Sequence, residues 1–163
     1  MGLVLKDLQD SLVKIYDKGK KGNPSPATVG LRTAGAYLQY CLKGQNAAGF
    51  PCTGMSGSSQ LGTDLSDLLM KSPNTGPSHA ATYSMRVNTC LSTFLSVHQT
   101  TIITAAGTSP LFSELNDLFS KPKGHASLFA MALGKALLNF TISAMVMGIV
   151  PDTPGVPFQG PIS

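Results

Sequence analysis

The chain has 163 residues and a formal net charge of +4, and only 12% of its residues are charged. That length suffices for one domain with its own hydrophobic core, without help from metals or disulfides. The charged fraction is about half that of a typical soluble protein, and the only arginines are Arg32 and Arg86. Nucleic-acid binding calls for a basic stripe interleaved with aromatic or arginine side chains, so the composition argues against it. A surface this poor in charge indicates that neighbouring proteins cover part of it, with a polar but uncharged surface as the alternative.

The three cysteines, Cys41, Cys52 and Cys90, form no close pair and no C-x-x-C motif. An odd number of separated cysteines is typical of free thiols in a reducing compartment and not of a disulfide framework. Cys41 and Cys90 fall on apolar helical faces, which predicts small core residues. Cys52 lies in "GFPCTGM" and is expected in a more exposed loop.

The N-terminal segment predicts an amphipathic helix. Leu5, Leu8 and Leu12 recur at spacings of three and four, with polar residues between them. This is the pattern of a helix that buries one face. The stretch "DKGKKGNPSP" then ends the helix.

A second helix is predicted to begin with Ser25 as N-cap and Pro26 at its first position, and to stop at Gly44. A serine oxygen accepts a hydrogen bond from the free N–H groups of a first turn, and proline fits that turn. Gly30 and Gly35 lie inside the helix, where they weaken it and would let a neighbouring backbone come close.

Residues 45–62, "QNAAGFPCTGMSGSSQLG", show no periodicity and are predicted to form one long loop. Loops of this length in a compact domain are usually functional or contact a partner. Phe50 and Met55 are its candidate contact residues. A short helix over about 63–72 is expected to follow.

The second half of the chain predicts three further segments. Residues 79–98 have the apolar spacing of a helix. "TTIIT" at 100–104 is β-branched and fits either a frayed helical turn or a short strand. Ser109 and Pro110 repeat the Ser-Pro helix start, and a last helix is expected over 125–150. The fold class is therefore mainly α, with five or six helices, long Gly/Pro-rich loops and an extended C-terminal arm.

No reaction centre is recognisable in the sequence. His79, His98 and His125 are far apart, and none has a metal-ligand partner three or four residues on. The segment around Ser56 approaches a nucleophile elbow, but Ser58 stands where G-x-S-x-G requires glycine. Phosphate-binding and dinucleotide-binding glycine motifs are absent from the sequence. We therefore expect no enzyme activity, no metal and no cofactor.

The last predicted helix is apolar on nearly all sides and could do one of three things. From Ala126 to Val150 it would be about 37 Å long, enough to span a bilayer. Lys135 and Asn139 lie near its middle, and a central lysine costs about 2.5–3.5 kcal/mol on insertion scales. We expect one side to pack on the domain's own core and another against a neighbouring copy, with a wholly internal helix or a membrane span as the alternatives. Its candidate interface residues are Phe129, Leu133, Leu137, Phe140, Ala144, Met145 and Gly148, of which Ala144 and Gly148 form a small-x-x-x-small step.

The tail "PDTPGVPFQGPIS" contains too many prolines to be helical. Its apolar residues Val156, Phe158 and Ile162 suit an arm that docks in a groove on an adjacent subunit. The predicted organisation is therefore one helical domain over 1–150 and an extended arm over 151–163.

The end of the chain, "LLNFTISAMVMGIVPDTPGVPFQGPIS", together with the Gly/Ser/Thr/Ala-rich composition, resembles small virion proteins of the tail and baseplate region of tailed bacteriophages. The resemblance implies a structural subunit of a tail, baseplate or neck, present in many copies in a virion that is assembled in the host cytoplasm. Its partners would be copies of itself and other virion structural proteins. Tube subunits of tails are β-rich, so a mainly helical chain favours an accessory or connecting subunit.

Two other classes stay open. A membrane-active, holin-like helical protein would account for the apolar last helix. A small helical ligand-binding domain would need a pocket with converging polar groups.

Overall fold

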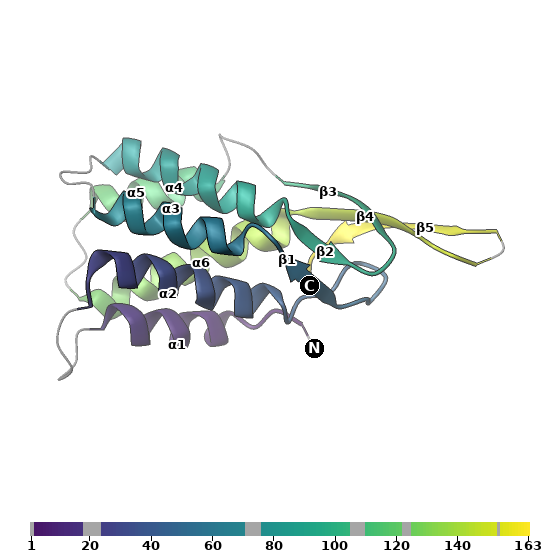
Figure 1. The fold of residues 1–163 in the computed structure, drawn as a ribbon, viewed down its shortest axis with the longest axis horizontal. Helices are drawn as coiled ribbons and strands as arrows, with labels where there is room; N and C mark the ends of the chain where they lie inside the picture. The colour runs from purple at the N-terminus through teal and green to yellow at the C-terminus, as the bar shows by residue number, and fades with distance from the viewer. Residues whose placement is uncertain (1, 18–23, 71–75, 105–109, 122–124, 153) are drawn as a thin grey trace.

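The computed structural model describes residues 2–17, 24–70, 76–104, 110–121, 125–152 and 154–163. Within these ranges the chain forms a bundle of six helices with small antiparallel sheets at one end (Figure 1). Mainly α is therefore the correct fold class, although strands are also present. The helices are α1 Leu5–Tyr16, α2 Pro26–Cys41, α3 Ser58–Met70, α4 Gly76–Leu91, α5 Pro110–Ser120 and α6 Ala126–Ser143.

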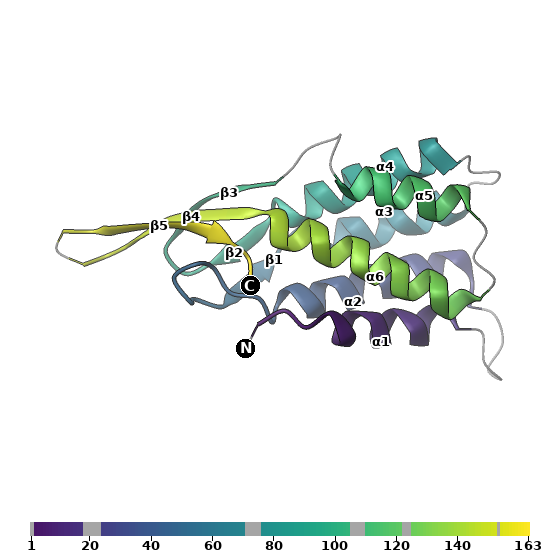
Figure 2. The same cartoon turned by 180° about the vertical axis from the view of Figure 1, so that it is seen from behind.

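The six helices form a closed ring in which each packs against the helix before it and the helix after it. α1 completes the ring by packing against both α2 and α6, and Figure 2 shows α6 lying across the bundle in front of α2 and α3. The interior is filled by aromatic and aliphatic side chains, of which the largest fully buried ones are Tyr37, Tyr83, Phe94 and Phe140. The apolar faces of the helices are thus covered mainly by other helices of the same chain.

The first two helices form where the local sequence predicts them. α1 buries Leu8 and Leu12, as the spacing predicted. In α2 the Ser25 Oγ accepts a hydrogen bond from the Thr28 N–H at 3.2 Å, so the predicted cap is confirmed. Ser109, the cap predicted for α5, lies outside the described residues.

Two helix backbones approach each other closely at Gly30 in α2. A Cβ atom placed there would lie 2.7 Å from the Leu65 carbonyl carbon and from the Ser66 Cα of α3. The Ser66 hydroxyl shares its hydrogen between the Ala27 carbonyl of α2, at 2.8 Å, and the Gly62 carbonyl of its own helix, at 2.7 Å. Gly30 therefore allows the close contact that the sequence predicted, whereas a Cβ on Gly35 would meet nothing within 4 Å.

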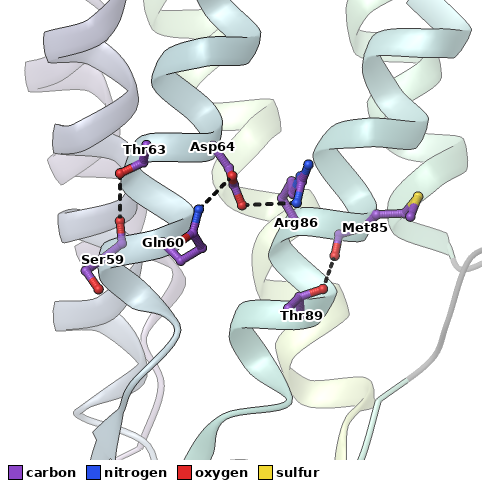
Figure 3. A network of polar contacts seen from close by, with 7 residues as sticks. All are labelled: Ser59, Gln60, Thr63, Asp64, Met85, Arg86 and Thr89. Carbon is purple, nitrogen blue, oxygen red and sulfur yellow. Dashed lines mark hydrogen bonds and ion pairs between the residues drawn. The ribbon is translucent and has the colours of Figure 1, made fainter.

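Polar side chains of α3 and α4 contact one another where the two helices pack together (Figure 3). Asp64 accepts a hydrogen bond from the Gln60 side chain at 3.0 Å and lies 3.4 Å from the Arg86 guanidinium. Arg86 is half exposed, so this ion pair contributes no more than about 1 kcal/mol to stability.

Two small sheets lie at the same end of the bundle. β1 Cys52–Met55 pairs antiparallel with β2 Phe94–Ser96. The second sheet is antiparallel with strand order β3-β4-β5, formed by β3 Gln99–Ile103, β4 Met145–Val150 and β5 Val156–Pro161. In both views β4 and β5 extend away from the helices as a long hairpin (Figures 1 and 2).

The predicted loop over 45–62 and the predicted helix over 79–98 are both corrected. The first contains β1 and the start of α3, and the second ends at Leu91 before β2. Asn46, which is buried, organises the region: its amide donates to the Ser96 Oγ at 3.0 Å, and its oxygen accepts from the Ala48 and Phe50 N–H groups. The pairing of β1 with β2 also buries Cys52, which the sequence placed in an exposed loop.

The last helix is also shorter than predicted. It ends at Ser143 instead of residue 150, because Ala144 adopts an extended backbone and the next six residues pair as β4. "TTIIT" is a strand and not a frayed turn. Within the tail over 151–163, Val156–Pro161 is an extended strand that pairs with β4 of its own chain. A free arm is therefore not confirmed, and the boundary expected at 150 falls inside a hairpin.

Candidate assembly surface

The hairpin forms because two apolar, β-compatible runs flank a turn. "MVMGIV" and "VPFQGP" pair without a break in register, from Met145 with Pro161 to Val150 with Val156. The connecting "PDTPG" combines the proline and glycine typical of turns. Gly148 is required within β4, because a Cβ there would lie 2.5 Å from the ring of Phe158 and would collide with the His98 carbonyl. The Phe158 ring thus covers the glycine across the strand pair.

Side chains alternate between the two faces of the sheet. One face, which we call the covered face, includes the buried Val146 and Gly148. The other, which we call the open face, carries Ile103 and Ile149, each 52% exposed. Its apolar members, from the three strands in register, are Ile103, Met145, Met147, Ile149, Pro157 and Pro161. Thr101 and Gln159 are its polar members.

The tip of the hairpin is apolar on both faces. β3 pairs with β4 only as far as Gly148, so the residues beyond it form a two-stranded ribbon. Ile149 is exposed on the open face, and Val156 is 52% exposed on the opposite face. Asp152 is the one charged residue between Ala144 and the end of the sequence. Because a two-stranded hairpin is only marginally stable in water, this tip is suited to contact with another surface.

The sheet also has a shallow pocket near the hairpin tip. It has a volume of about 460 Å³, and the side chains and backbone that line it come from all three strands. None of its lining residues carries a formal charge, so this pocket suits a neutral, apolar group. The lining residues are Thr100, Met147, Gly148, Ile149, Pro157, Phe158 and Gln159.

Four of the predicted interface residues lie in the core of their own chain. Leu133, Leu137, Phe140 and Ala144 are at most 2% exposed, because α6 packs between α1 and α5. These side chains are therefore not on the surface of the folded subunit. Phe129 is half-buried, with its ring centroid 5.1 Å from that of Tyr16.

The other predicted residues separate into anchors and surface positions. Ile162 is buried, its backbone N–H donates to the Ala144 carbonyl at 3.3 Å, and it fastens the end of the chain to its own domain. Phe158 and Gly148 pack on each other, as described above. Met145 and Val156 reach the surface of the hairpin.

Of the two predicted loop contacts, Met55 is buried. Phe50 is half-buried and lies edge-on to the His98 ring, at 4.9 Å between centroids. Met55 is therefore not on the surface of the folded subunit, whereas Phe50 stays a predicted contact residue.

α6 also presents an apolar stripe to solvent. Leu128, Met131 and Ile142 are exposed on one side, together with Lys135. Among the described residues, α6 is the one helix that is long and apolar enough to cross a membrane, and 39% of it is buried inside the protein. Length and composition alone are weak support for a membrane span, because the core helix of a soluble bundle can be equally long and apolar.

The described residues contain no group of three histidine, cysteine or acidic side chains placed to hold a metal ion. Cys41, Cys52 and Cys90 are free and buried. Burial raises the pKa of Cys90 to about 12 and that of Cys41 further, so both thiols are protonated at neutral pH. Protonated, buried thiols are poor nucleophiles and poor metal ligands.

Comparison of the chain with protein-family models, with curated proteins and with solved structures gives no match.

Sequence reasoning missed the hairpin although a signal for it was present. "PDTPG" stands between two apolar runs of equal length, which is the pattern of a hairpin with a longer turn. The first run was assigned to the preceding helix because neither glycine nor proline separates Ser143 from Met145.

Proposed function

We propose that the chain is a structural subunit of a multi-copy protein assembly and that the β4–β5 hairpin is its main contact surface. The observation that carries the proposal is the hairpin tip, which has exposed apolar side chains on both faces and projects beyond the helices. Exposed apolar residues that occur singly need no explanation, but a contiguous apolar surface is typical of a site of interaction. The tail, baseplate or neck of a tailed bacteriophage is the assembly that we propose, on the resemblance of the C-terminal residues.

A protein partner suits the hairpin better than a lipid bilayer. The tip is a two-stranded ribbon with open edges, and the hydrocarbon core of a membrane offers no hydrogen bonds to unpaired backbone groups. A protein groove can supply such partners and also bury Ile149 and Val156.

The test compares the full-length protein with a hairpin variant, Ile149→Lys/Val156→Lys. Both side chains are half exposed, so the subunit should keep its helical circular dichroism spectrum. Met85→Lys is the matched control, because Met85 is an exposed apolar residue on α4. Mass is measured by light scattering over a concentration series without detergent.

We expect the wild type and the Met85→Lys variant to form large, concentration-dependent species. We expect the hairpin variant to stay at one or two copies of the 17.0 kDa chain. A wild type that is no larger than the hairpin variant at any concentration refutes the proposal. A wild type that stays in solution only with detergent favours the membrane-active alternative.

A further inference from the structure

The two outer edges of the three-stranded sheet differ in how they can accept another strand. Ile162 donates its N–H to the Ala144 carbonyl in the direction of β4. Because backbone groups alternate along an antiparallel strand, residues 157, 159 and 161 of β5 point their backbone groups outward. Two of these three are prolines, which have no N–H. Pro157 and Pro161 therefore block strand addition at the β5 edge.

The β5 edge is also occupied where it continues. Ser163, the next outward-pointing residue, exchanges both of its backbone hydrogen bonds with Gln45, at 2.8 and 3.0 Å. This pairing ends the β5 edge against its own chain.

The β3 edge has neither kind of protection. Ile149 donates its N–H to the His98 carbonyl, so the odd-numbered residues of β4 point toward β3. Met145 and Met147 therefore bond with Ile103 and Thr101, and the N–H and C=O of Ile102 between them point away from the sheet. No described residue bonds these two groups. In both views β3 lies along the outer margin of its sheet (Figures 1 and 2).

We propose that two copies of the chain pair through their β3 edges, antiparallel about a two-fold axis at Ile102, to form one six-stranded sheet. The inference rests on the proposed assembly function and names one of its contacts. A second copy cannot use its β5 edge, because that edge is blocked by proline. Pairing of β3 with β3 is therefore the strand contact between copies that the edges of this sheet allow.

The side chains favour a second copy as the occupant. A two-fold axis places the same short segment of the two copies face to face. A charged residue in this segment would therefore lie near the like charge of the other copy. No Asp, Glu, Lys or Arg occurs between Arg86 and Glu114. With Ile102 opposite its equivalent, Thr101 lies opposite Ile103 of the other copy, and pairs of β-branched residues across strands are favourable. The bulge between Gln99 and Thr101 leaves Thr101–Ile103 as the regular part of the edge, which centres the pairing on Ile102.

The register can be tested by cross-linking. With Ile102 in a hydrogen-bonded pair, Thr101 and Ile103 of the two copies form a non-hydrogen-bonded pair about 4.5 Å apart at Cα, which lies within disulfide range. Thr101→Cys and Ile103→Cys are made separately in the full-length protein, and each alone and their equimolar mixture are oxidised mildly. Both positions are exposed, and the wild type, whose cysteines are buried, controls for background.

We expect a two-chain product in the mixture and none above background in either variant alone. No product in the mixture, or equal amounts in the mixture and in a single variant, overturns the inference. Because the disulfide traps weak pairing, this result does not depend on large assemblies. If cross-linking fails but the wild type forms large assemblies, only the β3 pairing is overturned. If the wild type also stays a single chain, the proposed function is refuted as well.

Charge variants give a second measurement. Thr101→Lys/Ile103→Lys places lysine opposite lysine twice across the two-fold axis, whereas Thr101→Lys/Ile103→Glu places lysine opposite glutamate twice. Both double variants are made in the chain that also carries Ile149→Lys/Val156→Lys. The Thr101→Lys/Ile103→Lys variant should then give single chains, and the Thr101→Lys/Ile103→Glu variant should retain dimers at the same concentration. Equal masses for the two charge variants contradict the pairing, because each changes the same exposed positions.

Discussion

Two glycines in one helix provide a sharp test of how closely α2 and α3 pack. A Cβ on Gly30 would lie 2.7 Å from backbone atoms of Leu65 and Ser66, whereas carbon atoms in contact are normally about 3.5–4.0 Å apart. Gly30→Ala therefore forces the two helix backbones apart by about 1 Å. It also stretches the hydrogen bond from the Ser66 hydroxyl to the Ala27 carbonyl.

The matched substitution Gly35→Ala isolates the cost of that contact. Gly35 is exposed in the same helix, and a Cβ there meets nothing within 4 Å. Both substitutions gain about 0.5–1 kcal/mol of helix propensity. Overpacking against a backbone costs about 1–3 kcal/mol in addition. The free energy of unfolding of the Gly30→Ala variant should therefore be lower than that of the Gly35→Ala variant by about this overpacking cost.

Urea unfolding followed by circular dichroism, at one fixed subunit concentration, measures the difference. Gly35→Ala should unfold at a higher urea concentration than the wild type, and Gly30→Ala at a lower one, with equal slopes. Gly30→Ala that stabilises the protein as much as Gly35→Ala would show that α2 and α3 do not touch at this point.

Two further predictions concern buried polar groups. Burial lowers the pKa of His79 below 6.5, so the unfolded chain binds a proton at this histidine more readily than the folded protein does. The contribution of His79 to the free energy of unfolding should therefore be fully present above about pH 6.5 and decrease as the pH falls below it. The decrease is at most about 1.4 kcal/mol per pH unit. Urea midpoints between pH 7.5 and 5 test this, and a slope that persists unchanged in His79→Leu assigns the effect elsewhere. Thr141 donates its hydroxyl hydrogen to the Leu137 carbonyl, so Tyr37 is the donor in the buried 2.7 Å bond between the Tyr37 and Thr141 hydroxyls. Tyr37→Phe should therefore cost about 0.5–1.5 kcal/mol in the free energy of unfolding, and the same cost measured in a Thr141→Val background would contradict the pairing.

Features that depend on near neighbours in the sequence were predictable, and features that depend on distant pairing were not. The Ser25 cap and the spacing of Leu8 and Leu12 act within one or two turns, so the sequence predicts the first helices well. Asn46, in contrast, orders its loop partly through Ser96, fifty positions away. The burial of Cys52 follows from the same pairing of β1 with β2.

The residues after Ser143 show the same limit at the candidate site. A short run of apolar residues fits a buried helix or a strand equally well, and periodicity alone does not separate them. Here Met145–Val150 becomes a strand because β3 and β5 lie on either side of it. Gly148, which the sequence assigned to contact between helices, is instead the place where Phe158 and the His98 carbonyl approach the backbone. Gly148→Leu would therefore disturb the sheet itself and is not a clean test of assembly.

Exposed apolar residues are arranged differently on the sheet and on most of the helices. Each helix of the ring has two helical neighbours. Apart from the apolar stripe on α6, the exposed apolar residues on the helices, such as Leu31 and Met85, belong to different elements. On the sheet, the apolar residues adjoin one another across three strands. Pairing of two β3 edges would place two such open faces side by side in one sheet, so the edge contact enlarges the surface that the hairpin presents. The two proposed contacts are therefore not alternatives, because the first increases the apolar area available to the second.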